Sequence, residues 1–146
     1  MTDERPDIAL DNLEIGQELG TIEYCFTPAD VSGYASFLGD DSPWFREKAG
    51  GDPLRVNPMM FANDYSNLLR KHYQTPGLVL VQTEHVYSGT VFTGQHLRTS
   101  GKVIDMGLRN GREFVIVETW TVDEKGAEVS RTITTAILSM EKKSES

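Results

Sequence analysis

The chain has 146 residues, of which 38 % are hydrophobic and 25 % are charged, a balance typical of one globular domain spanning 1–146. The net charge of −8 repels phosphate backbones and argues against nucleic-acid binding. A single cysteine, Cys25, excludes an internal disulfide and a thiolate zinc site. Because there is neither a membrane-length apolar run nor a signal-peptide core, we expect a cytoplasmic protein without a membrane span.

The first predicted elements are a strand and a helix. Alternating side chains over 21–26 are typical of a short β-strand. Thr27 is a suitable N-cap, and Pro28 suits the first helical position because the amide hydrogen that it lacks would be unsatisfied there. Apolar residues then recur at helical spacing until Gly39, a suitable C-cap. We therefore expect an amphipathic helix over 28–38.

A longer loop separates this helix from a second one. Residues 40–56 carry no sustained periodicity, with room for a short helix over 44–49. An Asn-Pro pair begins the second helix, which we expect over 57–71. Asp64 falls on the polar side of its helical pattern.

The second half of the chain changes to a period of two. The alternating runs are 78–88, 96–106, 112–122 and 129–140. Turn-forming residues at 107–111 and 123–126 connect the last three runs. The order of one strand, two helices and four strands predicts an α+β fold in which a curved antiparallel sheet packs against a helix.

The predicted sheet has one face against the helix and two edges. We expect the helix-facing side to include Val115, Val117, Ile133 and Ile137. The exposed edges of so small a sheet favour dimerisation. The polar ends of the chain, about 1–8 and 141–146, are expected to be frayed.

Common catalytic motifs are absent from the sequence. It contains neither a G-x-S-x-G nucleophile elbow nor a phosphate-binding loop of the form G-x-x-x-x-G-K-[ST] or G-x-G-x-x-G. His72, His85 and His96 have no second histidine or cysteine at ligand spacing, so we expect no metal site and no bound cofactor. His85, in a predicted strand beside Glu84, is the best candidate base of the three.

The stretch from Tyr34 to Phe45 carries the clearest chemical signal. It reads YASFLGDDSPWF and resembles the signature loop of the MaoC-like hydratase/dehydratase family, in which Tyr precedes Gly-Asp-x-Asn-Pro, an aliphatic residue and His. The matching positions are Tyr34, Gly39, Asp40 and Pro43. The runs 91–95 and 124–129 resemble a strand start and the final hairpin of the same family. The resemblance implies a single hot-dog fold, a curved antiparallel sheet wrapped around a central helix.

The departures from the family pattern affect its chemistry. A hydratase of this family acts on one water molecule with a carboxylate and an imidazole, while backbone amides hold the thioester oxygen. The resemblance assigns the carboxylate to Asp40, but Phe45 replaces the imidazole, and Pro58 replaces a glycine that supplies an amide. Ser42 and Trp44 also differ from the pattern. Loss of one amide donor costs about 10²–10³ in turnover, and loss of an acid–base partner about 10²–10⁴.

The resemblance therefore implies a subunit of a heteromeric (R)-specific enoyl-CoA hydratase or 3-hydroxyacyl-thioester dehydratase. A second MaoC-like hot-dog subunit would supply the Asp/His pair, while this chain would shape the acyl pocket for an acyl-CoA or acyl-carrier thioester. Beside Asp40, the residues assigned to this pocket are Tyr34, Trp44, Phe45, Met59, Met60, Phe61 and Asn63. Candidates for contacts with the carrier phosphates are Arg98, Lys102, Arg109 and Arg112.

Three alternatives stay open at the level of sequence. In the first, the chain is a self-sufficient hydratase homodimer that uses Asp40 with His85, Tyr34 or Asn63 from across the dimer. In the second, it is a hot-dog thioesterase that activates water with Asp64. In the third, it is a non-enzymatic acyl-CoA-binding protein.

Overall fold

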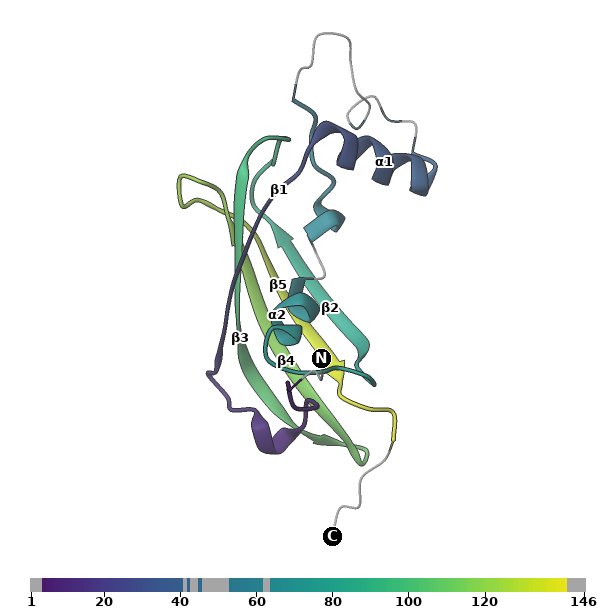
Figure 1. Ribbon diagram of the computed structural model, residues 1–146, viewed down its shortest axis with the longest axis vertical. Helices are drawn as coiled ribbons and strands as arrows, with labels where there is room; N and C mark the ends of the chain where they lie inside the picture. Colours follow the sequence, from purple (N-terminus) through teal and green to yellow (C-terminus); the bar gives the residue numbers. More distant parts are fainter. Residues whose placement is uncertain (1–3, 41, 43–44, 46–52, 62–63, 142–146) are drawn as a thin grey trace.

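The computed structural model describes residues 4–40, 42, 45, 53–61 and 64–141. In chain order, its elements are the 3₁₀-helix η1 (Leu10–Asn12), β1 (Glu18–Cys25), α1 (Pro28–Leu38), the 3₁₀-helix η3 (Pro58–Phe61), α2 (Asp64–Arg70), β2 (Val79–Tyr87), β3 (His96–Arg109), β4 (Arg112–Val122) and β5 (Glu128–Ile137). The strands form one antiparallel sheet in the order β1-β3-β4-β5-β2, which curves around α2 (Figure 1). The predicted α+β class and all five predicted strands are confirmed. None of the described helices is long and apolar enough to cross a membrane.

A two-residue turn links β3 and β4. Asn110 and Gly111 have φ angles of 53° and 76°, the left-handed values that the tight turns of β-hairpins need. Arg109 pairs with Arg112, so both strands continue up to this turn. The turn is therefore shorter than the five residues, 107–111, that the sequence indicated.

Local capping explains both ends of α1. Thr27 Oγ1 accepts a hydrogen bond from the Asp30 amide (3.1 Å), and Asp30 Oδ2 accepts one from the Thr27 amide (2.9 Å). At the other end, Gly39 adopts a φ of 72° and its amide bonds to carbonyls of the last turn. The predicted bounds of this helix are confirmed. α1 lies beyond one end of the sheet (Figure 1), and the Phe37 side chain is 86 % exposed.

The predicted second helix is divided between η3 and α2. Asn57 Oδ1 accepts a hydrogen bond from the Met59 amide (3.0 Å), which confirms the predicted start. Residues 62–63 lie outside the described part of the chain. Asp64, the first residue of α2, is only 8 % exposed, so its placement on a polar side was wrong. The reason is that the curved sheet reaches around α2, and the Tyr24 hydroxyl of β1 meets this carboxylate.

The main core lies between α2 and the concave face of the sheet. Leu68 and Leu69 of α2 are fully buried in one cluster with Val103, Val115 and Val117 of β3 and β4. Full burial of one such side chain contributes about 1.5–3 kcal/mol. This cluster holds α2 in the position from which its first turn faces the candidate site.

β5 turns a different face to the core from the one expected. Thr134 is buried on the helix-facing side, whereas Ile133 and Ile137 are only partly buried and lie on the other face. The assignment of these two isoleucines to the helix-facing side was wrong, while that of Val115 and Val117 is confirmed. Threonine and isoleucine are both β-branched and suit a strand equally, so the alternation of β5 does not reveal which set faces inward. The register with β4, which places Thr134 opposite Val117, decides it.

Part of the N-terminal segment is anchored. The Ile8 amide donates to the Gln74 carbonyl (2.9 Å), and the Gln74 amide donates to the Pro6 carbonyl (2.8 Å). Ile8 itself is 7 % exposed and belongs to the main core. The expectation that 1–8 is frayed was therefore wrong for Pro6 to Ile8, because one apolar side chain and a pair of backbone bonds hold them. Most of the range 141–146 lies outside the described residues.

Candidate functional site

The loop after α1 carries Asp40, the carboxylate assigned to catalysis. Its Oδ1 accepts a hydrogen bond from the Ser42 amide (2.8 Å), a contact that shapes the loop itself. The carboxylate is half-buried, as is Tyr34 on the neighbouring helix. Trp44 and Asn63, which were assigned to the acyl pocket, lie outside the described residues.

Phe45 stands at the position where the family pattern has histidine. Its ring is partly buried against an apolar cluster that includes Val31, Leu54 and Phe61. Its carbonyl accepts a hydrogen bond from Ser32 Oγ (3.2 Å), which ties the loop to α1. A phenyl ring has no proton to transfer, so this position supplies no acid–base group.

Three of the residues assigned to the acyl pocket come together in this cluster. Phe61 is buried, and Met60 and Phe45 pack partly buried against the same group of side chains. Met59 projects outward and is about half exposed, and the Tyr87 hydroxyl contacts its sulfur at 3.7 Å. The structure thus gathers apolar and adaptable side chains between α1 and the sheet.

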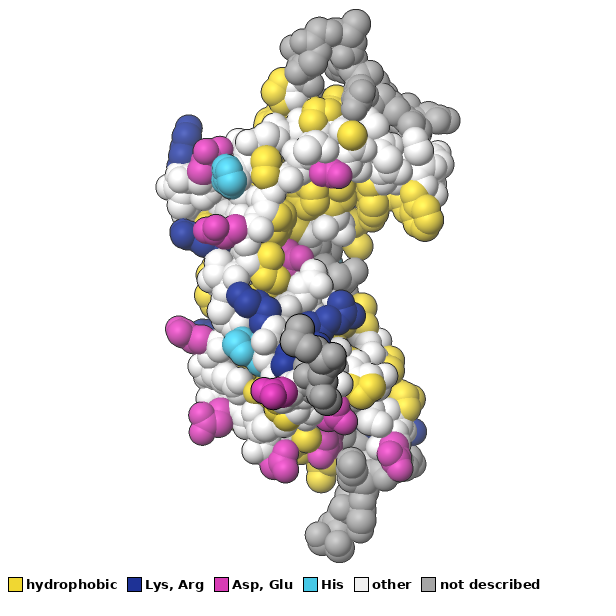
Figure 2. Space-filling model, viewed as in Figure 1, with side chains coloured by type: hydrophobic (Ala, Val, Ile, Leu, Met, Phe, Trp, Pro, Cys, Tyr) yellow, Lys and Arg dark blue, Asp and Glu magenta, His cyan; other side chains and the backbone are white. Residues whose placement is uncertain are grey.

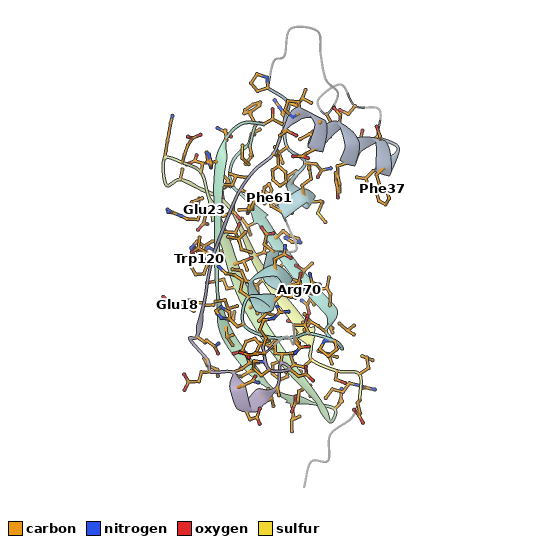
Figure 3. All side chains as sticks on the ribbon, in the orientation of Figure 1. Glu18, Glu23, Phe37, Phe61, Arg70 and Trp120 are labelled. Atoms are coloured by element: carbon orange, nitrogen blue, oxygen red, sulfur yellow. The ribbon has the colours of Figure 1, made fainter. Side chains whose placement is uncertain are left out.

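Sequence reasoning missed a line of aromatic rings that runs through this region. The ring centroids of Tyr24 and Phe26 are 5.2 Å apart, those of Phe26 and Phe61 6.4 Å, and those of Phe61 and Tyr87 6.5 Å. His85 stacks on Tyr87 with centroids 5.6 Å apart and an interplanar angle of 11°. Phe61 lies on η3, between α1 and α2 (Figure 3). The period-two alternation of β1 and β2, which places Tyr24 with Phe26 and His85 with Tyr87 on one face, was the available signal.

A buried polar chain lies where α2 begins. The Tyr24 hydroxyl donates to Asp64 Oδ2 (2.9 Å) and lies 2.8 Å from Thr99 Oγ1, which lies 2.7 Å from Thr121 Oγ1. Burial raises the pKa of Asp64, although hydrogen bonds from Tyr24, Thr99 and Asn67 oppose the shift. Burial also raises the pKa of Tyr24, and the charge of Asp64 adds to this effect. The chain of hydroxyls ties the first residue of α2 to β1, β3 and β4.

His85 lies on the helix-facing side of β2. Its Nδ1 is 2.9 Å from Thr132 Oγ1, and its Nε2 is 3.2 Å from Thr83 Oγ1. Burial lowers the pKa of His85, so its neutral form is favoured. Threonine hydroxyls of the sheet therefore orient both ring nitrogens, and the contacts within the described part of the chain place no carboxylate on this imidazole.

The basic residues considered for carrier phosphates are divided between two regions of the sheet. Arg98 and Lys102 belong to the first half of β3, and Arg109 and Arg112 flank the β3–β4 turn. The Arg109 guanidinium lies over the Phe114 ring at 4.2 Å, and Arg112 Nε donates to the Met140 carbonyl (3.1 Å). They do not form one phosphate site. The residues that the structure describes also contain no group of three or more metal-binding side chains.

The two edges of the sheet differ. At the β1 edge, Lys71 Nζ donates to the Thr21 carbonyl (2.7 Å) and His72 Nε2 lies 2.8 Å from the Leu19 carbonyl, so two backbone acceptors are covered. β2 forms the other edge, and its large exposed apolar side chains are Val79, Leu80, Val81, Val86 and Tyr87. Apolar side chains are also visible along the side of the molecule below α1 (Figure 2). Within the described part of the chain, β2 is therefore the more open edge of the sheet.

Solved structures with a similar fold share little sequence identity with the chain, and no protein-family model and no curated protein matches it. An (R)-hydratase from A. caviae involved in PHA biosynthesis has a TM-score of 0.70 and 21 % identity, with 86 % of this chain and 96 % of that chain covered. The HadBC (3R-hydroxyacyl-ACP dehydratase) complex from Mycobacterium tuberculosis has a TM-score of 0.72 and 17 % identity, with 84 % and 96 % covered. A MaoC-like dehydratase from Rhodospirillum rubrum has a TM-score of 0.69 and 18 % identity, with 89 % and 95 % covered. The chain therefore has the hot-dog fold of MaoC-like hydratases and dehydratases.

Proposed function

We propose that this chain is the non-catalytic subunit of a heteromeric (R)-specific enoyl-thioester hydratase or 3-hydroxyacyl-thioester dehydratase. The observation that carries the proposal is Phe45, an apolar ring packed in a core cluster where the family pattern places a proton-transferring imidazole. Adding water to a double bond, or removing it, needs one group that takes a proton and one that gives a proton. Asp40 could supply only one of these groups, so this chain cannot run the reaction alone, and a second subunit with an intact Asp/His pair supplies both.

The side chains around Phe45 suit the role of shaping an acyl pocket. Met60 and Phe61 share its cluster, and Met59 and Tyr87 present apolar surface beside it. Unbranched methionine side chains adapt to irregular apolar shapes, which suits a wall against a flexible acyl chain. The proton chemistry then takes place on the partner's side of the pocket.

The open edge at β2 supports a place for that partner. Its exposed apolar side chains and its place at the end of the strand order suit strand addition, whereas Lys71 and His72 cover the β1 edge. One solved structure with a similar fold, the HadBC dehydratase, is a complex. We therefore place the second hot-dog subunit at β2, where it would continue the sheet and face the cluster around Phe45.

The test is a hydration assay with a purified trans-2-enoyl-CoA substrate. The chain alone should show no turnover, and the chain mixed with a hot-dog subunit encoded in a neighbouring reading frame, carrying the intact Asp/His pair, should be active. In the mixture, Asp40→Asn in this chain should leave turnover within about twofold, while the same change in the partner's aspartate should cost about 10²-fold or more. The amide oxygen of the substitute can still accept the Ser42 hydrogen bond.

Two results would contradict the proposal. An isolated homodimer that hydrates the substrate at the rate of the mixture, and loses this rate in Asp40→Asn, would show a self-sufficient enzyme. Hydrolysis of acyl-CoA by the chain alone, lost in Asp64→Asn, would support the thioesterase alternative instead, with the buried carboxylate of α2 as the base.

A further inference from the structure

Tyr87, the last residue of β2, carries an exposed aromatic ring that its neighbours hold in place. The His85 ring stacks on it, with centroids 5.6 Å apart and an interplanar angle of 11°, and the Phe61 ring meets it nearly at a right angle, with centroids 6.5 Å apart. The Tyr87 hydroxyl also contacts the Met59 sulfur at 3.7 Å. Although three side chains contact it, Tyr87 is still 40 % exposed. The ring therefore has a fixed orientation before any ligand binds, which lowers the entropy cost of binding.

The segment around Tyr87 covers one side of the ring more than the other. Side chains two positions apart project to the same side of a strand, so the neighbours of Tyr87 on that side are His85 and residue 89. Residue 89 is a glycine, and a Cβ atom there would be directed toward Val129, 3.4 Å from its Cγ1. The chain therefore covers the ring with an imidazole on one side and places no side chain two positions further on.

The side chains that hold the Tyr87 ring are uncharged. Burial lowers the pKa of His85 and raises the pKa of Tyr87, so both rings are neutral at pH 7. The contacts of the two His85 nitrogens with Thr132 (2.9 Å) and Thr83 (3.2 Å) fix the imidazole beneath the phenol. Met59 adds a polarizable sulfur, which makes favourable contacts with aromatic rings. We call the surface formed by Tyr87, His85 and Met59 the Tyr87 platform.

The Tyr87 platform extends the proposed acyl pocket toward the surface. Phe61, which contacts the Tyr87 ring, belongs to the same apolar cluster as Phe45. The platform also lies on β2, the more open edge, where we place the second subunit. Any apolar wall accommodates a linear acyl chain, whereas oriented aromatic rings give additional stabilisation only to a group that is itself aromatic. The platform therefore favours one kind of acyl group over another.

We infer that the substrates of this site are thioesters whose acyl group carries an aromatic ring, and that Tyr87 selects them by contact between the two rings. This assignment rests on the proposed function, because it gives the acyl pocket a substrate class. Aromatic rings attract each other through the negative face and positive edge that each carries, and a saturated ring with the same number of carbons lacks this charge pattern. The difference between an aromatic and a saturated ring therefore isolates the contribution of the platform from simple apolar burial.

The experiment compares 3-phenylpropanoyl-CoA with 3-cyclohexylpropanoyl-CoA, two thioesters with equal numbers of acyl carbons and no double bond to hydrate. Calorimetric titration gives their dissociation constants for the full chain and for its mixture with the subunit that carries the Asp/His pair. We expect the phenyl ester to bind about fivefold more tightly than the cyclohexyl ester in the mixture.

Three variants locate this preference. Tyr87→Leu should reduce the ratio of the two dissociation constants to about 1, and Tyr87→Phe, which keeps the ring, should preserve it. The matched control is Phe37→Leu, because Phe37 is an aromatic side chain of α1 that is 86 % exposed and has no part in the platform. It should leave the ratio unchanged. Both esters are measured on the same preparation, so a fraction of unfolded protein cancels in the ratio.

Equal affinity for the two esters, a preference that persists in Tyr87→Leu, or no measurable binding of either ester in both preparations would overturn the inference. The hydration assay with a linear enoyl-CoA reports separately on the proposed function. An active mixture without the aromatic preference would remove the substrate class and leave the subunit role intact. An inactive mixture, with a preference on the chain alone that Tyr87→Leu abolishes, would remove the subunit role and support the Tyr87 platform.

Discussion

The close packing of α2 against the sheet at Gly101 offers a quantitative test of the structure. A Cβ atom at Gly101 would lie 2.8 Å from Leu68 Cδ1, 3.1 Å from Thr119 Cγ2 and 3.2 Å from the Glu118 carbonyl oxygen. Gly101→Ala must therefore displace the fully buried Leu68 or the neighbouring strand. Such overpacking costs about 1–3 kcal/mol, and the lower chain entropy of alanine returns about 0.5–1 kcal/mol. We expect a net destabilisation of about 1 kcal/mol, or ~3 °C in Tm for a domain of this size.

The matched control is the same substitution at Gly33, in the exposed part of α1. A Cβ atom there would meet nothing within 4 Å, and alanine is a better helix former than glycine by about 0.8–1 kcal/mol. Urea denaturation should therefore move the midpoint down for Gly101→Ala and up for Gly33→Ala. If Gly101→Ala were as stable as the original protein, the contact between α2 and β3 would be looser than the structure has it, and the reasoning would fail.

Three further substitutions test the polar chain, the cap and the core. Burial raises the pKa of Asp64 above its ordinary 3.8, so the folded protein binds the carboxyl proton more tightly than the unfolded chain does. The stability that this proton contributes is complete below about pH 3.8 and is lost as the pH rises through the raised pKa. Asp64→Asn does not titrate, so its stability relative to the original protein should rise as the pH increases above about 4 in urea titrations, and a pH-independent difference would count against this. Thr27→Ala removes the N-cap of α1 and should cost about 1 kcal/mol, whereas Thr27→Ser should cost little. Leu68→Ala should cost about 2–5 kcal/mol in thermal unfolding, and a loss below 1 kcal/mol would contradict its complete burial.

The contrast between the sheet edges links the fold to the proposed partner. Unpaired strand edges invite association with other strands, and proteins often cover them with charged side chains. Here Lys71 and His72 cover carbonyl groups of β1. β2 instead combines an open edge with exposed apolar side chains, including Val81 and Val86. A protein that protects one edge and leaves the other apolar is suited to one defined neighbour rather than to open-ended assembly.

Much of the architecture follows from signals that are local in the sequence. Thr27 and Gly39 mark α1 because caps and left-handed turns depend on residues within a few positions of each other. The period-two runs predict every strand of the sheet, because successive side chains of a strand alternate between its faces. The 34–45 segment also indicates the fold through its resemblance to the MaoC-like pattern, and that resemblance implies that Phe45 stands where the pattern has histidine.

The tertiary structure decided which of these side chains face inward and which groups meet. Asp64 is buried because Tyr24, forty positions earlier, reaches it across the curved sheet. β5 faces the helix with Thr134 rather than Ile133 because its register with β4 sets the face. Arg5 and Arg70 line one pocket only because the N-terminal segment packs against the end of α2. Local patterns specify backbone conformation, but burial, register and charge proximity depend on segments remote in sequence, which come together only when the chain folds.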